Sequence, residues 1–211
     1  CIAARFYVGG ETTENLLDFL MWAFTQRHGA DGTPMPFHGV PYMLYTDQGA
    51  MFKSAPVRSF LSAMDVRQRW HAPGNARATG SAEVAQNIFE RGFESRLRFI
   101  DRASLDVPTL NALAETWMHA FNGGKKHSRH GMTRYQCWNR ITADQLVIAP
   151  PAEHCRDLAY SAPKETRVNT FLEIKFAGQT YSVKDVPNVM VGQKVMVAKN
   201  PWRVDAAQVA Y

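Results

Sequence analysis

Apolar and polar residues alternate along the N-terminal half of the chain in a pattern that predicts short strands and amphipathic helices. A β-branched and aromatic run at 2–8 predicts a strand that ends at Gly9. Apolar residues at helical spacing predict a helix over about 14–27, capped by Thr12 or Thr13, whose apolar face would pack on a sheet. Three elements follow: a buried strand at 41–46, a short helix at 56–64 and a strand with one wet face at 66–71.

The C-terminal half begins with helices and ends with short strands. Helical spacing predicts helices at 80–99 and 107–121, and a Pro- and Ala-rich stretch at 149–163 predicts an exposed linker. Short runs between turn signals then predict a small barrel built from 166–176, 179–183, 193–198 and 203–211. The apolar side of this barrel is expected to contain Phe171, Ile174, Phe176 and Tyr181.

Composition narrows the class of protein. The chain has 211 residues, a formal charge of +5 and a pI near 9.2, which modestly favours a polyanionic partner. Its three cysteines, Cys1, Cys137 and Cys155, form no Cys-x-x-Cys pair, so we expect neither a disulfide framework nor a zinc site. Charges interrupt every apolar run, and no leader is evident, so we expect a soluble cytoplasmic protein with no membrane partner.

Two acidic residues are candidates for chemistry. Asp47 follows the apolar run at 41–46 and precedes Gly49, so we expect it at the C-terminal tip of a strand. Glu83 falls in the first turn of the helix that begins at Gly80. Spacing alone is weak support, because the chain contains 19 acidic residues. The alternative is that Asp47 forms a turn and Glu83 complements the helix dipole.

The sequence around these acids resembles the catalytic core of the DDE transposases and retroviral integrases. The resemblance rests on Asp-x-Gly at 47–49, Ala-Pro-Gly-Asn at 72–75 and Gly-x-x-Glu at 80–83. It implies an α/β, RNase H-like mixed sheet flanked by helices. It also implies DNA 3′-end cleavage and strand transfer, with Asp47 and Glu83 as catalytic residues and as ligands of two Mg²⁺ or Mn²⁺ ions.

Polar and basic residues near these acids are expected to contact DNA phosphates. Thr79 stands where many relatives have Lys, which weakens a DNA contact at that position. For the loop at 73–80 and the basic run at 122–135, the alternative is an ordinary solvated loop. Val84, Ile88 and Phe89 are expected on the opposite side of the helix from Glu83. The residues expected at DNA are Asn75 and Arg77 in a loop, Asn87 and Arg91 beside Glu83, and Lys125, Lys126, Arg129 and Arg134 in the basic run.

The β-rich end resembles the compact barrel that follows the core in transposases of the bacteriophage Mu type, including Asn-Pro-Trp-Arg at 200–203. This divides the chain into an N-terminally truncated core at 1–122, a basic helix-loop segment and linker at 123–163, and a small barrel at 164–211. The partners that the resemblance implies are double-stranded DNA at element ends and target, further copies in a homo-oligomer, and an ATPase accessory protein. The expected location is the nucleoid-associated bacterial cytoplasm.

The family also requires an Asp on the first strand of its sheet. The run at 2–8 contains no acid and corresponds to the third strand of the related cores, so we expect the strands that carry the leading Asp to be missing. Two alternatives therefore stay open. One is a non-catalytic DNA-binding or assembly module, and the other is a nuclease of the same fold.

Overall fold

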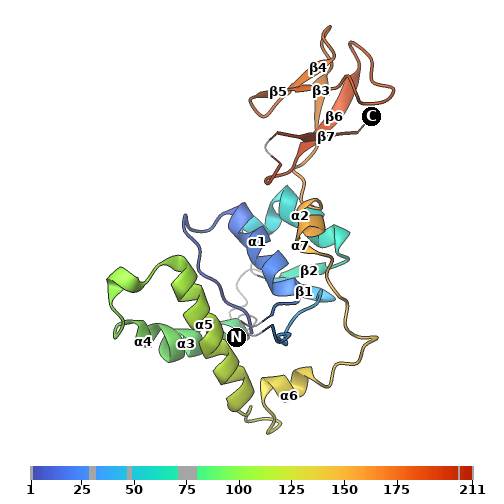
Figure 1. Ribbon diagram of the computed structural model, residues 1–211. Helices are drawn as coiled ribbons and strands as arrows, with labels where there is room; N and C mark the ends of the chain where they lie inside the picture. Colours follow the sequence, from blue (N-terminus) through green and yellow to red (C-terminus); the bar gives the residue numbers. More distant parts are fainter. Residues whose placement is uncertain (1, 29–31, 47–48, 71–79, 204, 211) are drawn as a thin grey trace.

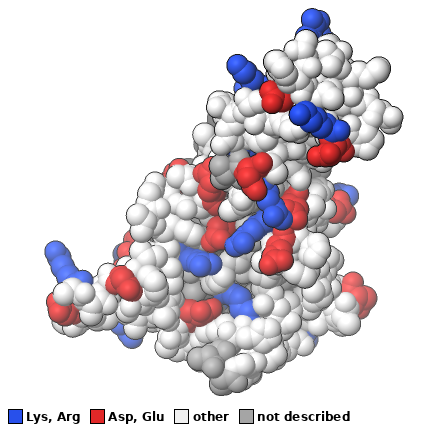
Figure 2. Space-filling view, turned by 45° about the horizontal axis from the view of Figure 1, so that its top comes forward, with Lys and Arg blue, Asp and Glu red and all other residues white. Residues whose placement is uncertain are grey.

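The computed structural model describes residues 2–28, 32–46, 49–70, 80–203 and 205–210. A helical body forms one end of the molecule, and the C-terminal strands form a small unit at the other end (Figure 1). Lys and Arg are interspersed with Asp and Glu on the face that Figure 2 shows. No helix formed by the described residues is long and apolar enough to cross a membrane.

Three helices enclose the first hydrophobic core: α1 (Thr13–Phe24), α2 (Ala55–Ala63) and α7 (Ala152–Arg156). Thr12 caps α1 by accepting a hydrogen bond from the backbone N–H of Asn15 at 3.1 Å, which confirms one of the two predicted caps. The helix ends three residues before the predicted limit. Its buried residues, with those of α2, are Leu17, Leu20, Met21, Phe24, Val57, Phe60 and Leu61.

Two short parallel strands lie beside this core: β1 (Met43–Thr46) and β2 (Arg67–Trp70). The 3-10 helix η1 (Met51–Lys53) and α2 supply the crossover that a parallel pair requires. The prediction that β1 is buried is wrong, because Met43 is 48% and Tyr45 50% exposed. The described part of this sheet contains two strands, β1 and β2, and the exposed Met43 and Tyr45 show that one face of β1 is not covered by other described elements.

The predicted strand at 2–8 is absent from the structure, where this segment forms no described ladder. The side chain of Asn111 takes the place of a neighbouring strand: its Oδ1 accepts from the N–H of Phe6 at 2.7 Å, and its Nδ2 donates to the carbonyl of Phe6 at 3.1 Å. The ring of Phe6 packs against Phe89 and Phe93. A side-chain amide thus satisfies backbone groups that the sequence pattern assigned to a sheet.

A second group of helices begins with α3 (Gly80–Phe89), which continues through the π-helical turn η3 (Glu90–Glu94) into α4 (Ser95–Leu97). The predicted helix at 80–99 is therefore present, but it contains a π turn that the helical period did not predict. After the 3-10 turn η4 (Arg102–Ser104), α5 (Val107–Gly124) packs on this helix. Their shared core consists of Phe89, Phe93, Ala114 and Met118.

The segment that follows α6 (Arg134–Trp138) does not behave as the exposed tether that was expected at 149–163. Cys155 and Ala159 are fully buried in the core of α1 and α2. The expected short helical turn is present as α7, and the expectation of exposure is wrong at Cys155 and Ala159, because an Ala- and Pro-rich composition does not reveal whether a small side chain fills a gap between helices. The division of the chain into domains at 122 and 163 stays a prediction.

The C-terminal strands form two antiparallel sheets. The first contains β3 (Lys164–Arg167), β6 (Lys194–Lys199) and β7 (Ala207–Ala210), in the order β3-β6-β7. The second contains β4 (Glu173–Phe176) and β5 (Gln179–Ser182). Both sheets share one core, formed by Val168, Ile174, Val183, Val195 and Val197.

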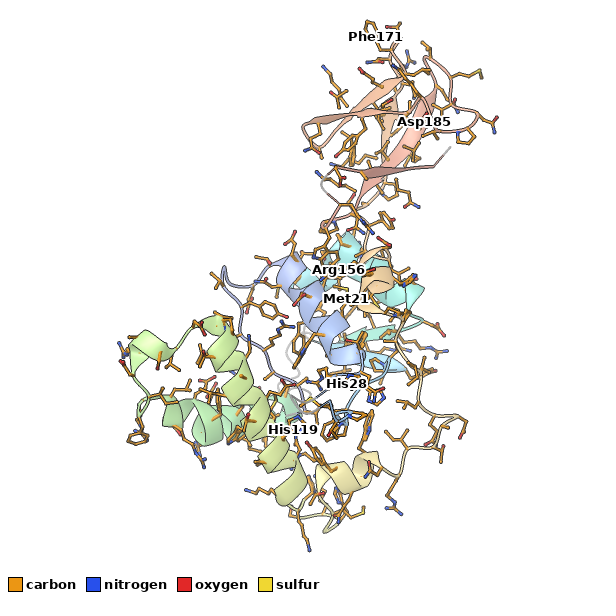
Figure 3. The ribbon with its side chains drawn as sticks, in the orientation of Figure 1. Met21, His28, His119, Arg156, Phe171 and Asp185 are labelled. Carbon is orange, nitrogen blue, oxygen red and sulfur yellow. The ribbon has the colours of Figure 1, made fainter. Side chains whose placement is uncertain are left out.

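A turn divides the predicted strand at 166–176 into β3 and β4. The side chain of Asn169 accepts hydrogen bonds from the N–H groups of Phe171 and Glu173, both at 2.9 Å, and Leu172 has a positive φ of 54°. This turn directs Phe171 outward, so the prediction that Phe171 is in the core is wrong: the residue is 70% exposed. Figure 3 shows it at the outer end of the unit, far from Met21 and Arg156.

Candidate nucleic-acid interface

A groove of about 550 Å³ lies between the α3–η3 helix and the C-terminal half of α5. We call it the α3–α5 groove. Its lining combines cations with apolar and aromatic side chains, which is the composition typical of a site for a polyanion with planar bases. The lining residues are Val84, Asn87, Ile88, Arg91, Gly92, Arg96, Trp117, Phe121 and Lys125.

Trp117 and Phe121 form the aromatic wall of the groove. They lie one turn apart on α5, and their rings stack with centroids 5.0 Å apart and an interplanar angle of 13°. Gly92 allows this arrangement, because a Cβ at its position would overlap atom Cζ2 of Trp117. The missing side chain at Gly92 is therefore what lets the indole lie against η3.

The π turn explains how one helix can serve both the core and the groove. The N–H of Ser95 donates to the carbonyl of Glu90, five residues earlier, which is the bond that defines a π turn. Phe89 and Phe93 then both pack near the core, with centroids 5.0 Å apart. Phe89 is 8% and Phe93 4% exposed, and Arg91 between them projects to the groove.

Two cations meet at the ring of Phe121, although nine positions separate them in the sequence. The guanidinium carbon of Arg134 lies 4.5 Å and Nζ of Lys125 5.7 Å from the ring centroid. A bridge between Lys126 and Thr133 closes the loop that joins them. The basic run is thus an ordered hairpin loop whose two ends deliver positive charge to one aromatic ring.

The hairpin loop is held by its own hydrogen bonds. The N–H of His127 donates to the carbonyl of Met132 at 2.8 Å, and Thr133 and Gln136 form a capping box at the start of α6. The capping box fixes the first turn of α6, where Arg134 is the first residue. The side chain of Arg134 is therefore placed by regular local structure.

The cations of the groove lack acidic partners within the part of the chain that the structure describes. None of the ion pairs between described residues involves Arg91, Arg96, Lys125 or Arg134. Atom Nη1 of Arg134 is also buried without a hydrogen-bond acceptor among these residues. A partly buried guanidinium without a counter-charge is costly unless a ligand supplies an anion.

A second cluster of polar side chains connects α6, which follows the hairpin loop, to α5. The hydroxyl of Tyr135 forms a hydrogen bond with Nδ1 of His119, and Arg27, three residues after α1, pairs with Glu115 at 3.5 Å. Burial raises the pKa of Tyr135 and lowers the pKa of His119. His119, labelled in Figure 3, therefore joins α5 to α6, the helix that directly follows the hairpin loop.

The structure brings together three of the residues that were expected to contact DNA: Asn87, Arg91 and Lys125 all line the groove. Arg134 lies beside them at Phe121. Lys126 and Arg129 are exposed in the hairpin loop but do not line the groove. Asp47, Asn75 and Arg77 lie outside the described residues, so their predicted roles stay predictions.

Glu83 lies in the first turn of α3, where it is exposed, and its backbone carbonyl accepts a hydrogen bond from Nδ2 of Asn87 at 3.0 Å. Asn87 therefore links the turn that carries Glu83 to the groove. Within the described ranges, no group of three His, Cys, Asp or Glu residues could hold a metal ion. Glu83 is the one candidate metal ligand that the structure places.

Sequence reasoning misassigned two residues and missed two others. Val84 and Ile88 were expected on the side opposite to Asn87 and Arg91, but all four line the groove. Their positions fit helical spacings of three, four and seven, so this signal was present in the sequence. Arg96 and Phe121 were not predicted, because only the packing of α5 on α3 brings their side chains to the same groove.

No protein-family model matches the chain, and no curated protein matches it. Among solved structures, it is similar to the cryoEM structure of the simian T-cell lymphotropic virus intasome in complex with PP2A regulatory subunit B56 gamma. That match has 18% identity and a TM-score of 0.47, and it covers 94% of this chain and 62% of the other. The chain is also similar to the HTLV-2 integrase catalytic core domain in complex with magnesium in its trimeric form. In that case the identity is 20% and the TM-score 0.36, with 46% of this chain and 57% of the other covered. The chain thus spans less than two thirds of the length of either of these retroviral integrase and intasome chains.

Proposed function

We propose that this chain binds nucleic acid through the α3–α5 groove and the adjoining hairpin loop. The observation that carries the proposal is the group of cations around Trp117 and Phe121 that have no acidic partner among the described residues. Arg and Lys beside aromatic rings suit a phosphate backbone and its bases together, and the part-buried Arg134 has no acceptor for its Nη1 among the described residues.

A finer proposal concerns the chemistry. We propose that the chain is part of a polynucleotidyl transferase of the DDE transposase and integrase class, with an RNase H-like core and a small β-barrel at its C-terminal end. The sequence pattern around Asp47 and Glu83 supports this, and so does the position of Glu83 one turn before the groove residue Asn87. Double-stranded DNA, a homo-oligomer and an ATPase accessory protein are its proposed partners.

In this proposal Asp47 and Glu83 are the ligands of Mg²⁺ or Mn²⁺. Two such ions supply stabilisation of the charge that develops on the entering and leaving oxygens of a phosphodiester. An exposed carboxylate at the start of α3 is a suitable hard oxygen ligand. One described carboxylate is too few for two ions, so we assign no catalytic step to the described residues.

A second candidate function is a non-catalytic nucleic-acid-binding or assembly module. The observation that favours it comes from the sequence: the run at 2–8 contains no acid that could serve as the leading Asp of the family, whereas the groove residues suit binding without any metal. The two functions share the groove and differ only in what Asp47 and Glu83 do.

The groove is tested by the salt dependence of duplex binding. In the Arg91→Ala/Lys125→Ala variant, we expect the slope of log affinity against log salt to fall by about 0.9 for each lost phosphate contact. Affinity should fall for every sequence alike, because phosphate contacts do not read bases. Fluorescence anisotropy of a labelled duplex at several salt concentrations measures both quantities.

The matched control is Arg58→Ala/Arg102→Ala, which removes the same charge from exposed residues that do not line the groove. Its slope should stay close to that of the wild type. Equal losses in the two double variants would show that net charge alone drives binding, and an unchanged slope in Arg91→Ala/Lys125→Ala would refute the proposed interface.

Glu83→Gln separates binding from chemistry. Without divalent metal, removing one negative charge beside the groove should leave duplex affinity unchanged or slightly higher. If the chain nicks DNA with Mg²⁺, the variant should lose that activity. A loss of metal-free affinity as large as that of Arg91→Ala/Lys125→Ala would show that Glu83 shapes the groove and would argue against a metal ligand. Nicking that persists in Glu83→Gln would refute the proposed role of Glu83 as a metal ligand.

A further inference from the structure

Apolar side chains make up much of the α3–α5 groove, and contacts to a phosphate backbone do not require them. Val84 is 59% exposed and Ile88 is half-buried, and both lie on the wall opposite Trp117 and Phe121. Phosphates need only cations and N–H donors. An exposed apolar wall inside a cationic groove therefore indicates a ligand that brings an apolar surface as well as a negative charge.

We propose that the groove holds one unpaired nucleobase, taken out of the helical stack, while its cations hold the flanking phosphates. This inference rests on the proposed function and specifies its substrate. The groove volume of about 550 Å³ is within the range of roughly 300–1,000 Å³ that small-molecule sites have. A paired base inside a duplex cannot enter a groove between two helices, whereas an extruded base can.

The cations of the groove come from both of its sides. Arg91 and Arg96 lie on the α3–α4 side, and Lys125 lies on the α5 side, so phosphates on both sides of one base meet a cation. Arg134 covers the ring of Phe121, with its Nη1 lacking an acceptor among the described residues. Because Arg134 covers that ring, the base is expected to contact Val84, Ile88 and the edge of Trp117.

An acidic peptide is the competing ligand, since it also combines negative charge with apolar side chains. The stacked aromatic pair and the guanidinium groups favour a planar, π-rich ligand over an aliphatic one. The comparison of the two ligands is part of the test.

The test uses two duplexes of equal length and charge. One carries a single unpaired 2-aminopurine and the other a paired one. We expect the 211-residue chain to bind the first about 5-fold more tightly, the low end of the range for stacking of one base, because the base meets only the edge of Trp117. The fluorescence of the unpaired 2-aminopurine should change on binding, because the base moves into contact with groove side chains.

Two variants test the base contact and the phosphate contact separately. Val84→Gln removes an apolar contact without a change of charge, and the preference for the unpaired base should fall while affinity for the paired duplex stays unchanged. Its control is Val8→Gln, at a position 78% exposed and outside the groove. Arg96→Ala should weaken binding of both duplexes more than Arg98→Ala, because Arg98 lies over Phe99 and does not line the groove.

The outcomes are distinct. Equal affinity for the two duplexes, with no fluorescence change, would overturn the base pocket and leave the nucleic-acid interface standing. No binding of either duplex would overturn the proposed function as well. If a poly-glutamate peptide containing Leu and Trp displaces the unpaired duplex at equal concentration, the occupant is an acidic peptide and the proposal fails.

Discussion

Gly92 shows how one residue determines the shape of the groove. A Cβ at this position would overlap the indole of Trp117, which stacks on Phe121. Gly92→Ala must displace the indole or bend the π turn, and overpacking of this kind costs about 1–3 kcal/mol. We expect the variant to be destabilised by that amount in urea unfolding, and to lose duplex affinity because Phe121 supports Lys125 and Arg134.

The control for this prediction is Gly124→Ala at the end of α5, where a Cβ would meet nothing within 4 Å and φ is not positive. This variant should be as stable as the wild type or slightly more stable, because alanine restricts the unfolded chain. A Gly92→Ala variant that unfolds at the wild-type urea concentration would contradict the close packing of Trp117 on η3.

At the level of elements, the start of α5 depends on a titratable cap. Hydrogen bonds with the side chain and the backbone N–H of Thr109 lower the pKa of Asp106. The N–H of Thr109 donates to Oδ1 of Asp106 at 2.8 Å. A carboxyl whose pKa is lower in the folded state stabilises the fold above its unfolded pKa, and this stabilisation is lost as the pH falls through its folded pKa.

Asp106→Asn keeps a capping oxygen but removes this titration. We therefore expect the Tm of the wild type to exceed that of Asp106→Asn at pH 7, and the difference to shrink as the pH falls below the range in which Asp is ionised. Circular dichroism melts between pH 7 and pH 3 measure it. A Tm difference that is constant over this range would show that the charge of Asp106 contributes nothing to the cap.

On the scale of the whole molecule, Asn200 joins the C-terminal unit to the helical body. Its side chain, in a residue 2% exposed, donates to the carbonyl of Arg156 at 2.6 Å and accepts from the N–H of Trp202 at 2.9 Å. Asn200→Ala removes both of these hydrogen bonds, each of which contributes about 0.5–1.5 kcal/mol. We expect α7 to unfold locally more often, and the buried thiol of Cys155 to react faster with a labelling reagent.

The measurement is the rate of thiol labelling in a background where Cys155 is the only cysteine. Gln208→Ala, at an exposed position of β7, is the matched control and should label at the background rate. Limited proteolysis provides a second measurement, because wild-type residues 152–159 should resist cleavage. Early cleavage within 152–159 would instead support the prediction that this segment is an exposed linker.

The sequence by itself determined the elements whose signals are local. Apolar residues at helical spacing predicted the helices now seen as α1, α2 and α5, and Thr12 caps α1 as one of two predicted caps. A residue three or four positions away along the chain is a neighbour in any helix, so period and caps act without the rest of the molecule. The same local rule predicted that Arg91 would share a face with Asn87, as the groove shows.

Only the tertiary structure decided features in which distant segments meet. The run at 2–8 has strand-forming residues, but Asn111, more than a hundred positions away, satisfies the backbone of Phe6. Cys155 is buried because α7 fills space beside α1 and α2. The groove exists because α5 packs on the α3–η3 helix at Gly92, which brings Arg91, Trp117 and Lys125 together. Contacts of this kind depend on which surfaces meet after folding, and a one-dimensional pattern of apolar and polar positions contains no information about that choice.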